Sequence, residues 1–171
     1  MRRFVFGLGA ALLIAAIAAP VASAAANREV VEKNSVATLH FEGLDACLGQ
    51  GYAFTYTGDY VRTRTTTLWY DASGALIKEV LIIHFDGIET NDSDPTKWLK
   101  VNGERRLVFD YEAGTFTETG ALRHVTARGQ GIVLQQVGRV VNTIDFSANL
   151  FTGGPHDMDE GNWAAFCAAL A

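Results

Sequence analysis

The chain has 171 residues, of which 49% are apolar and 19% are charged, and it contains only 3 Pro and 2 Cys. This composition excludes a disordered chain, a collagen-like chain and a disulfide-dense miniprotein, and the single long apolar stretch excludes a multi-pass membrane protein. The net charge of −5 argues against a nucleic-acid partner.

The first 26 residues have the pattern of an export signal. Two arginines follow the initiating Met, an apolar run extends over residues 4–19, and Ala22-Ser23-Ala24 offers the small residues that a signal peptidase recognises. The alternative is a transmembrane anchor, but a helix over this run would span about 24 Å, which is less than the roughly 30 Å hydrocarbon core. We therefore predict a cleavable, Sec-type signal peptide over residues 1–26, no stable membrane anchor, and a secreted single domain over residues 27–171.

The two cysteines are expected to form one disulfide. Cys47 and Cys167 lie near opposite ends of the predicted domain, and two cysteines of an exported protein are usually paired. The alternative is a reactive thiol, which a basic neighbour or a C-x-x-C motif would activate. Neither cysteine has a Lys, Arg or His within three residues, so the structural bridge is favoured.

Most of the domain has the period-two alternation of β-strands. Tyr52, Phe54, Tyr56 and Tyr60 share one parity, and Gly58 suggests a bulge among them. Turn residues separate the later segments, and Asn102-Gly103 has the residues of a two-residue hairpin turn. The expected strands cover residues 52–60, 63–70, 76–88, 98–101, 105–111, 115–127, 132–146 and 150–152.

The period of the sequence changes near its C-terminus. Trp163, Phe166, Cys167 and Leu170 lie at i, i+3, i+4 and i+7, which places them on one face of a helix over residues 161–170. Many short sequential strands joined by turns favour a single antiparallel β-barrel, with a β-sandwich as the alternative. The predicted fold is therefore mainly β, with a short C-terminal amphipathic helix.

Five short motifs occur along the domain, namely Asp45-Ala46-Cys47, residues 115–120, Gly138-Arg139, residues 153–157 and residues 166–170. In these motifs the chain resembles small exported β-rich proteins of actinobacteria, a group without an assigned activity. The resemblance implies export, cysteine pairing and a barrel-like fold, and it brings no catalytic residue.

The sequence carries no motif of a known catalytic or metal centre. There is no G-x-S-x-G, no P-loop, no H-E-x-x-H and no Cys pair at zinc spacing, so we expect no catalytic residue, metal or cofactor. The acidic stretch 156–160 could hold a cation, but it lacks the ligand order of an EF-hand loop, and a solvated helix-capping loop is favoured.

One candidate ligand site remains. His124 and Glu118 share a parity with Phe116 and Leu122, and an unbroken strand would place all four on one side of the sheet. If His84 faces the same lumen, two imidazoles and a carboxylate would lie among apolar walls. A bulge at Gly120 would separate the pairs, and the alternative is that these side chains are hydrogen-bonded or exposed at a rim.

Two function classes follow from this interior. The favoured hypothesis is a secreted, non-enzymatic barrel that binds a small apolar ligand in its lumen, or an extracellular protein through its loops. The alternative is a small secreted isomerase-like or cyclase-like enzyme that uses the His/Glu interior, which rests on fold analogy.

Overall fold

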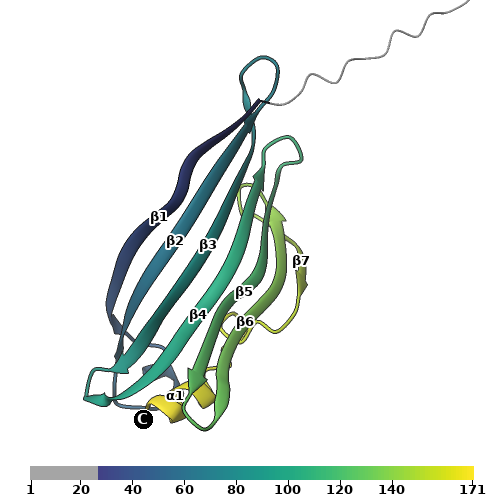
Figure 1. The fold of residues 1–171 in the computed structure, drawn as a ribbon. Helices are drawn as coiled ribbons and strands as arrows, with labels where there is room; N and C mark the ends of the chain where they lie inside the picture. The colour runs from purple at the N-terminus through teal and green to yellow at the C-terminus, as the bar shows by residue number, and fades with distance from the viewer. Residues whose placement is uncertain (1–26) are drawn as a thin grey trace, which may run out of the picture.

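The computed structural model describes residues 27–171, which form one seven-stranded antiparallel sheet and a short C-terminal helix. Each strand pairs with the next one along the chain, so the order across the sheet is β1-β2-β3-β4-β5-β6-β7 (Figure 1). The predicted signal peptide lies outside the described residues. The strands are β1 (Asn27–Leu44), β2 (Tyr56–Tyr70), β3 (Leu76–Asn91), β4 (Asp94–Asp110), β5 (Thr115–Ala127), β6 (Gly131–Thr143) and β7 (Asn149–Gly153), with a 3-10 turn at Leu48–Gln50 and helix α1 at Ala164–Leu170.

The sheet is curled but open, so the predicted closed barrel is wrong, and the alternative sandwich is also wrong because there is one sheet. β1 and β7 are its two edges and do not pair. β7 has only 5 residues against the 18 of β1, which is too short to close the seam. After β7 the chain turns back along β6, where Pro155 accepts a hydrogen bond from the Val137 amide, instead of extending toward β1.

Strand β1 was not predicted, because its sequence has no clear alternation. As an edge strand it is exposed along most of its length, so neither face imposes an apolar period. Its pairing with β2 shifts register three times. One of these shifts lies between Phe41 and Leu44 of β1, which pair with Gly58 and Tyr56 of β2. The bulge expected near Gly58 therefore lies in the partner strand, since β2 itself pairs with β3 without a break there.

The predicted Asn102-Gly103 hairpin is also wrong, since both residues lie inside β4. Gly103 pairs with Phe85 of β3, and a Cβ on Gly103 would lie 2.5 Å from the Phe85 ring. Glycine is needed here to admit an aromatic ring over the strand, not to turn the chain. The tight turn between β3 and β4 is instead formed by Asp92 and Ser93, within the polar stretch 91–95.

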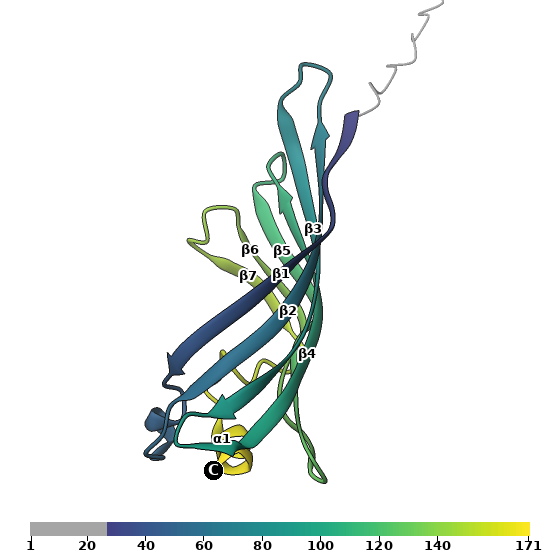
Figure 2. The same cartoon turned by 60° about the vertical axis from the view of Figure 1, so that its left-hand side comes forward.

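The C-terminal helix is confirmed, although it begins at Ala164 and not at residue 161. Phe166, Cys167 and Leu170 are completely buried, as the helical period predicts. Figure 2 shows α1 within the curve of the sheet at one end, whereas the β2–β3 and β4–β5 hairpins lie at the other end. In the described part of the chain, no helix is long and apolar enough to span a membrane.

The hydrophobic core fills the end of the curled sheet where α1 lies. Leu99, Val101, Val125 and Leu134 from β4, β5 and β6 are almost fully buried against the helix. Burying such side chains stabilises the fold by about 1.5–3 kcal/mol each. The core therefore covers only part of the concave face.

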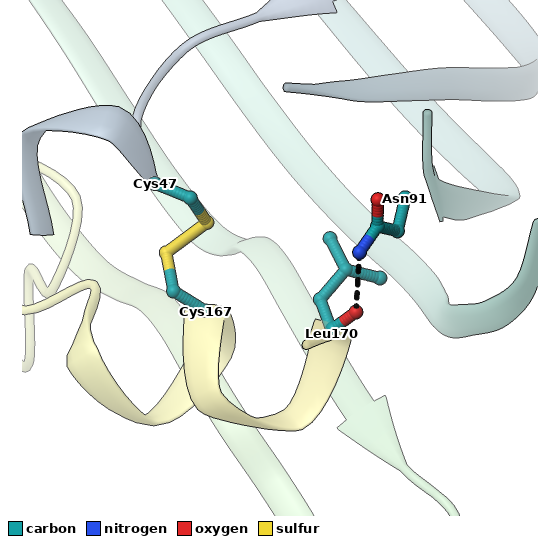
Figure 3. The surroundings of a disulfide bond; sticks show 4 residues. All are labelled: Cys47, Asn91, Cys167 and Leu170. Atoms are coloured by element: carbon teal, nitrogen blue, oxygen red, sulfur yellow. Dashed lines mark hydrogen bonds between the residues drawn. A yellow bond between two sulfur atoms is a disulfide. The ribbon is translucent and has the colours of Figure 1, made fainter. Parts of the chain in front are cut away.

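The predicted Cys47–Cys167 disulfide is confirmed, and it fixes α1 to the segment between β1 and β2 (Figure 3). Both cysteines are fully buried, and their Cα atoms are 5.4 Å apart. At the end of the helix the Asn91 side-chain amide donates a hydrogen bond of 3.1 Å to the Leu170 carbonyl. Helix α1 is thus held by a covalent bond, by apolar burial and by a hydrogen bond to the β3–β4 turn.

We expect the double variant Cys47→Ala/Cys167→Ala to unfold at a lower urea concentration than the wild type. The bond closes a loop with a sequence separation of 120 residues, and the chain-entropy model assigns such a loop about 4–5 kcal/mol of unfolding free energy. Urea denaturation followed by circular dichroism measures the loss. As a control, reductant should destabilise the wild type but not the double variant, and equal stability of the two proteins would contradict the assignment.

Candidate functional site

A groove of about 830 Å³ lies on the concave face beside the α1-packed core. Its walls come from β1 to β6 and from the segments on either side of β7, so it is bounded by most of the sheet. Phe41 of β1 and Phe146 of the β6–β7 turn are both about half exposed, and they lie at its margins. The apolar lining residues are Leu39, Phe41, Leu44, Ile83, Phe85, Phe116, Leu122, Val140, Phe146 and Met158, and the polar ones are Tyr60, Arg62, Arg105, Glu118, Arg123, Gln136, Asn142 and Asp159.

A buried ion pair separates the groove from the core. Arg123 of β5 lines the groove and pairs with Glu89 of β3, which has no exposed surface. The Tyr60 hydroxyl donates a hydrogen bond of 2.5 Å to the same Glu89 oxygen, Oε1. The Arg123 guanidinium also lies 5.8 Å from the centre of the Trp163 ring, in a cation–π contact. Strand β5 is thereby connected to β2, β3 and the segment before α1.

The two tyrosines beside this pair have perturbed acidities. Burial raises the pKa of Tyr60 above its usual value, and the nearby positive charge of Arg123 offsets part of the shift. The pKa of Tyr56 is raised for the same reason. Both hydroxyls therefore stay protonated at neutral pH, which allows Tyr60 to act as the donor to Glu89.

A second ion pair lies in the groove wall. Arg105 of β4 donates from Nη1 to Oε1 of Glu118 in β5, over 3.1 Å. Burial raises the pKa of Glu118, and the neighbouring Arg105 opposes that shift. Glu118 is the more buried partner, with 15% of its side chain exposed against 38% for Arg105.

A third guanidinium has no such partner. Arg62 of β2 lines the groove and forms no ion pair with any carboxylate of the described residues. Its Nε atom is buried and has no hydrogen-bond partner there. An unsatisfied buried donor costs roughly 1–3 kcal/mol, so a ligand atom that accepts a hydrogen bond from this N–H would remove that cost.

Of the predicted site residues, the structure places only Glu118 in the groove. Phe116 and Leu122 line it with Glu118, as the parity predicts, but His124 does not. A bulge at Leu122 is the reason, because Ala121 pairs with Val137 while Arg123 pairs with the adjacent Gln136. Beyond the extra residue the parity is inverted, so Arg123 and Val125 take the concave side and His124 faces outward.

His84 also lies on the outer face. It alternates with Ile83 and Phe85, which line the groove, so its side chain points the opposite way. Its Nδ1 lies 3.4 Å from a Glu104 oxygen, and about half of the side chain is exposed. The interior of two histidines and a carboxylate is therefore not assembled.

The acidic stretch 156–160 is held within the fold by Gln136. The Gln136 side-chain amide donates to Nδ1 of the buried His156, over 3.1 Å, and accepts from the Met158 amide, over 3.2 Å. Asp157 accepts a hydrogen bond from the Gln135 amide. Within residues 27–171, no group of three or more His, Cys, Asp or Glu side chains is placed to hold a metal ion.

The groove arginines were not predicted as site residues, because the candidate site was built on histidines and a carboxylate. The sequence did contain one indication of Arg62, because it has the same parity as Tyr60 in β2. Residues of one parity in a strand face the same side of the sheet, so Arg62 was expected beside the aromatic side chains. Arg123 could not have been found by parity, because the bulge at Leu122 inverts it.

Comparisons with protein-family models, with curated proteins and with solved structures return no match to this chain.

We expect Arg123→Met to lower the unfolding free energy by about 3–5 kcal/mol, because it leaves the Glu89 carboxylate buried and unpaired. The double variant Glu89→Gln/Arg123→Met removes both charges and should recover part of that loss. Arg105→Met, at the more exposed pair, is the matched control and should lose less. Urea denaturation of the wild type, these three variants and Glu89→Gln alone checks this; a double variant that loses the sum of the Glu89→Gln and Arg123→Met effects would contradict a coupled pair.

Proposed function

We propose that this protein is an exported binding protein that takes up a small, largely apolar molecule in the groove of its open sheet. The observation that carries the proposal is the groove itself, a concavity of about 830 Å³ with apolar walls and a few polar side chains. Ligand sites of proteins have this character and lie between about 300 and 1,000 Å³. Export is supported by the pattern of residues 1–26, and the disulfide is in keeping with an oxidising compartment.

The division of the concave face supports the same function. α1 packs on the end formed by Leu99, Val101 and Leu134, which stabilises the sheet. The neighbouring region is walled by Phe85, Phe116 and Val140 but is not filled by any described segment. A purely structural sheet would gain stability from filling this space, since each buried apolar side chain contributes favourably.

The enzymatic alternative loses its original support. It requires His84 or His124 near Glu118, and both histidines lie on the other face of the sheet. The Glu118 carboxylate that remains in the groove is held by Arg105, as expected of a structural pair. Ligand binding without catalysis is therefore the function we favour. We also propose that the protein is similar to the exported β-rich proteins of actinobacteria.

The neutral fluorophore N-phenyl-1-naphthylamine tests this function. The wild type should bind one molecule and raise its emission, as expected when an apolar dye leaves water. Val140→Trp places an indole in the groove and should abolish binding, whereas Ile82→Trp adds the same group to the outer face and should not. Unchanged dye emission with the wild type, or equal binding by both variants, would overturn the proposal. Circular dichroism confirms that each variant is folded.

A further inference from the structure

Two of the three arginines that line the groove are paired with a carboxylate. Arg123 is committed to Glu89, and Arg105 is committed to Glu118. Asp159, the remaining acid of the lining, accepts a hydrogen bond of 2.5 Å from the Gln136 amide. Among residues 27–171, Arg62 is the one groove arginine without a carboxylate partner, and its buried Nε, like those of Arg105 and Arg123, has no hydrogen-bond acceptor. Arg62 therefore brings to the groove a positive charge that no carboxylate pairs with, whereas the Asp159 carboxylate is largely exposed to solvent, with 67% of its side chain accessible.

The position of Arg62 suits the end of an elongated ligand. Arg62 pairs with Ala37 on one side and with Phe85 on the other, so its neighbours on the concave face are a small residue and an aromatic ring. Ile83 and Phe85 of β3 separate it from Arg105 of β4. Because adjacent strands are about 4.8 Å apart, β2 and β4 are about 10 Å apart. An anion above β3 is thus within reach of Arg62, with the Arg105 guanidinium on its other side.

The remainder of the groove is suited to a hydrocarbon. Phe116 and Val140, on the strands across the groove from β2, present no charge, and neither does Phe146 at the margin. The Phe116 and Phe146 rings pack at an interplanar angle of 50° with their centres 4.9 Å apart, which forms a continuous apolar wall. A ligand that satisfies both parts of the site must have an anionic end and an apolar body.

We propose that the groove binds an amphipathic monocarboxylate, with the carboxylate at Arg62 and the hydrocarbon along Phe116, Val140 and Phe146. A guanidinium and a carboxylate form charge-assisted, commonly bidentate hydrogen bonds, which are the strongest polar contacts available in this site. The inference rests on the proposed function and adds the chemical class of the ligand and the residue that selects it.

The test compares four ligands with the same twelve-carbon chain by isothermal titration calorimetry, below the micelle concentrations of the charged ligands and below the solubility limit of dodecanol. Dodecanoate should bind the wild type about tenfold or more tightly than dodecanol, because a hydrogen bond to a charged group is worth at least that factor. Dodecylamine, as a cation, should bind less tightly than dodecanol. Dodecyl phosphate distinguishes the anion: if it binds more tightly than dodecanoate, the site selects phosphate and the carboxylate assignment is overturned.

Two variants locate the selectivity. Arg62→Gln should lower the affinity for dodecanoate to a value close to the affinity of the same variant for dodecanol. Arg106 follows Arg105 in β4, and its exposed side chain points to the opposite face of the sheet. Arg106→Gln should therefore change neither affinity. A preference for dodecanoate that persists in Arg62→Gln would overturn the role of this residue.

Failure of the inference can be told from failure of the proposed function. If dodecanol and dodecanoate bind the wild type equally well, the groove binds apolar molecules without selecting an anion, and only the further inference fails. If neither compound binds, the proposed function itself fails. The comparison between ligands uses the wild type alone, so it does not depend on the folding of any variant.

Discussion

The packing of α1 against one end of a curled sheet is the constraint on which the rest of the structure depends. Seven strands in sequential order could curl further into a closed barrel, but β7 is short and the chain after it returns along β6. The Cys47–Cys167 disulfide then holds the helix over Leu99, Val101, Val125 and Leu134. Because the helix covers only this end, the sheet has a solid core there and a groove beside it.

A single extra residue in β5 determines which side chains enter the groove. Leu122 is the bulge, and it exchanges His124 for Arg123 on the concave side. Gly120, close to the bulge, has φ +126, and a Cβ there would collide with the Glu104 carbonyl, so the strand approaches β4 more closely than another residue would allow. The exchange completes the Glu89–Arg123 pair, and it leaves Glu118 as the one predicted site residue in the groove.

Sequence patterns correctly predicted those parts of the structure that depend on residues close together in the chain or on the two cysteines. The helical stripe of Phe166, Cys167 and Leu170, the cysteine pairing and most of the turns were predictable, because each depends on nearby residues or on the scarcity of cysteine. The edge strand β1 was not, since an exposed edge imposes no apolar period. Asn102-Gly103 was mistaken for a turn because glycine also serves close packing, here under Phe85. Closure of a barrel would require β1 to pair with β7, which are far apart in the sequence, and the pattern of neighbouring residues does not indicate whether such strands pair.

The most direct test of a binding site on the concave face is methyl NMR of the protein titrated with N-phenyl-1-naphthylamine. We expect the methyl signals of Ile83, Leu122 and Val140 to shift on binding, because these side chains line the groove. The signals of Val101, Val125 and Leu134 in the solid core should stay close to their positions in the free protein. Shifts concentrated at Val61, Ile82 and Ile88, the exposed residues of the outer face, would contradict a binding site on the concave side.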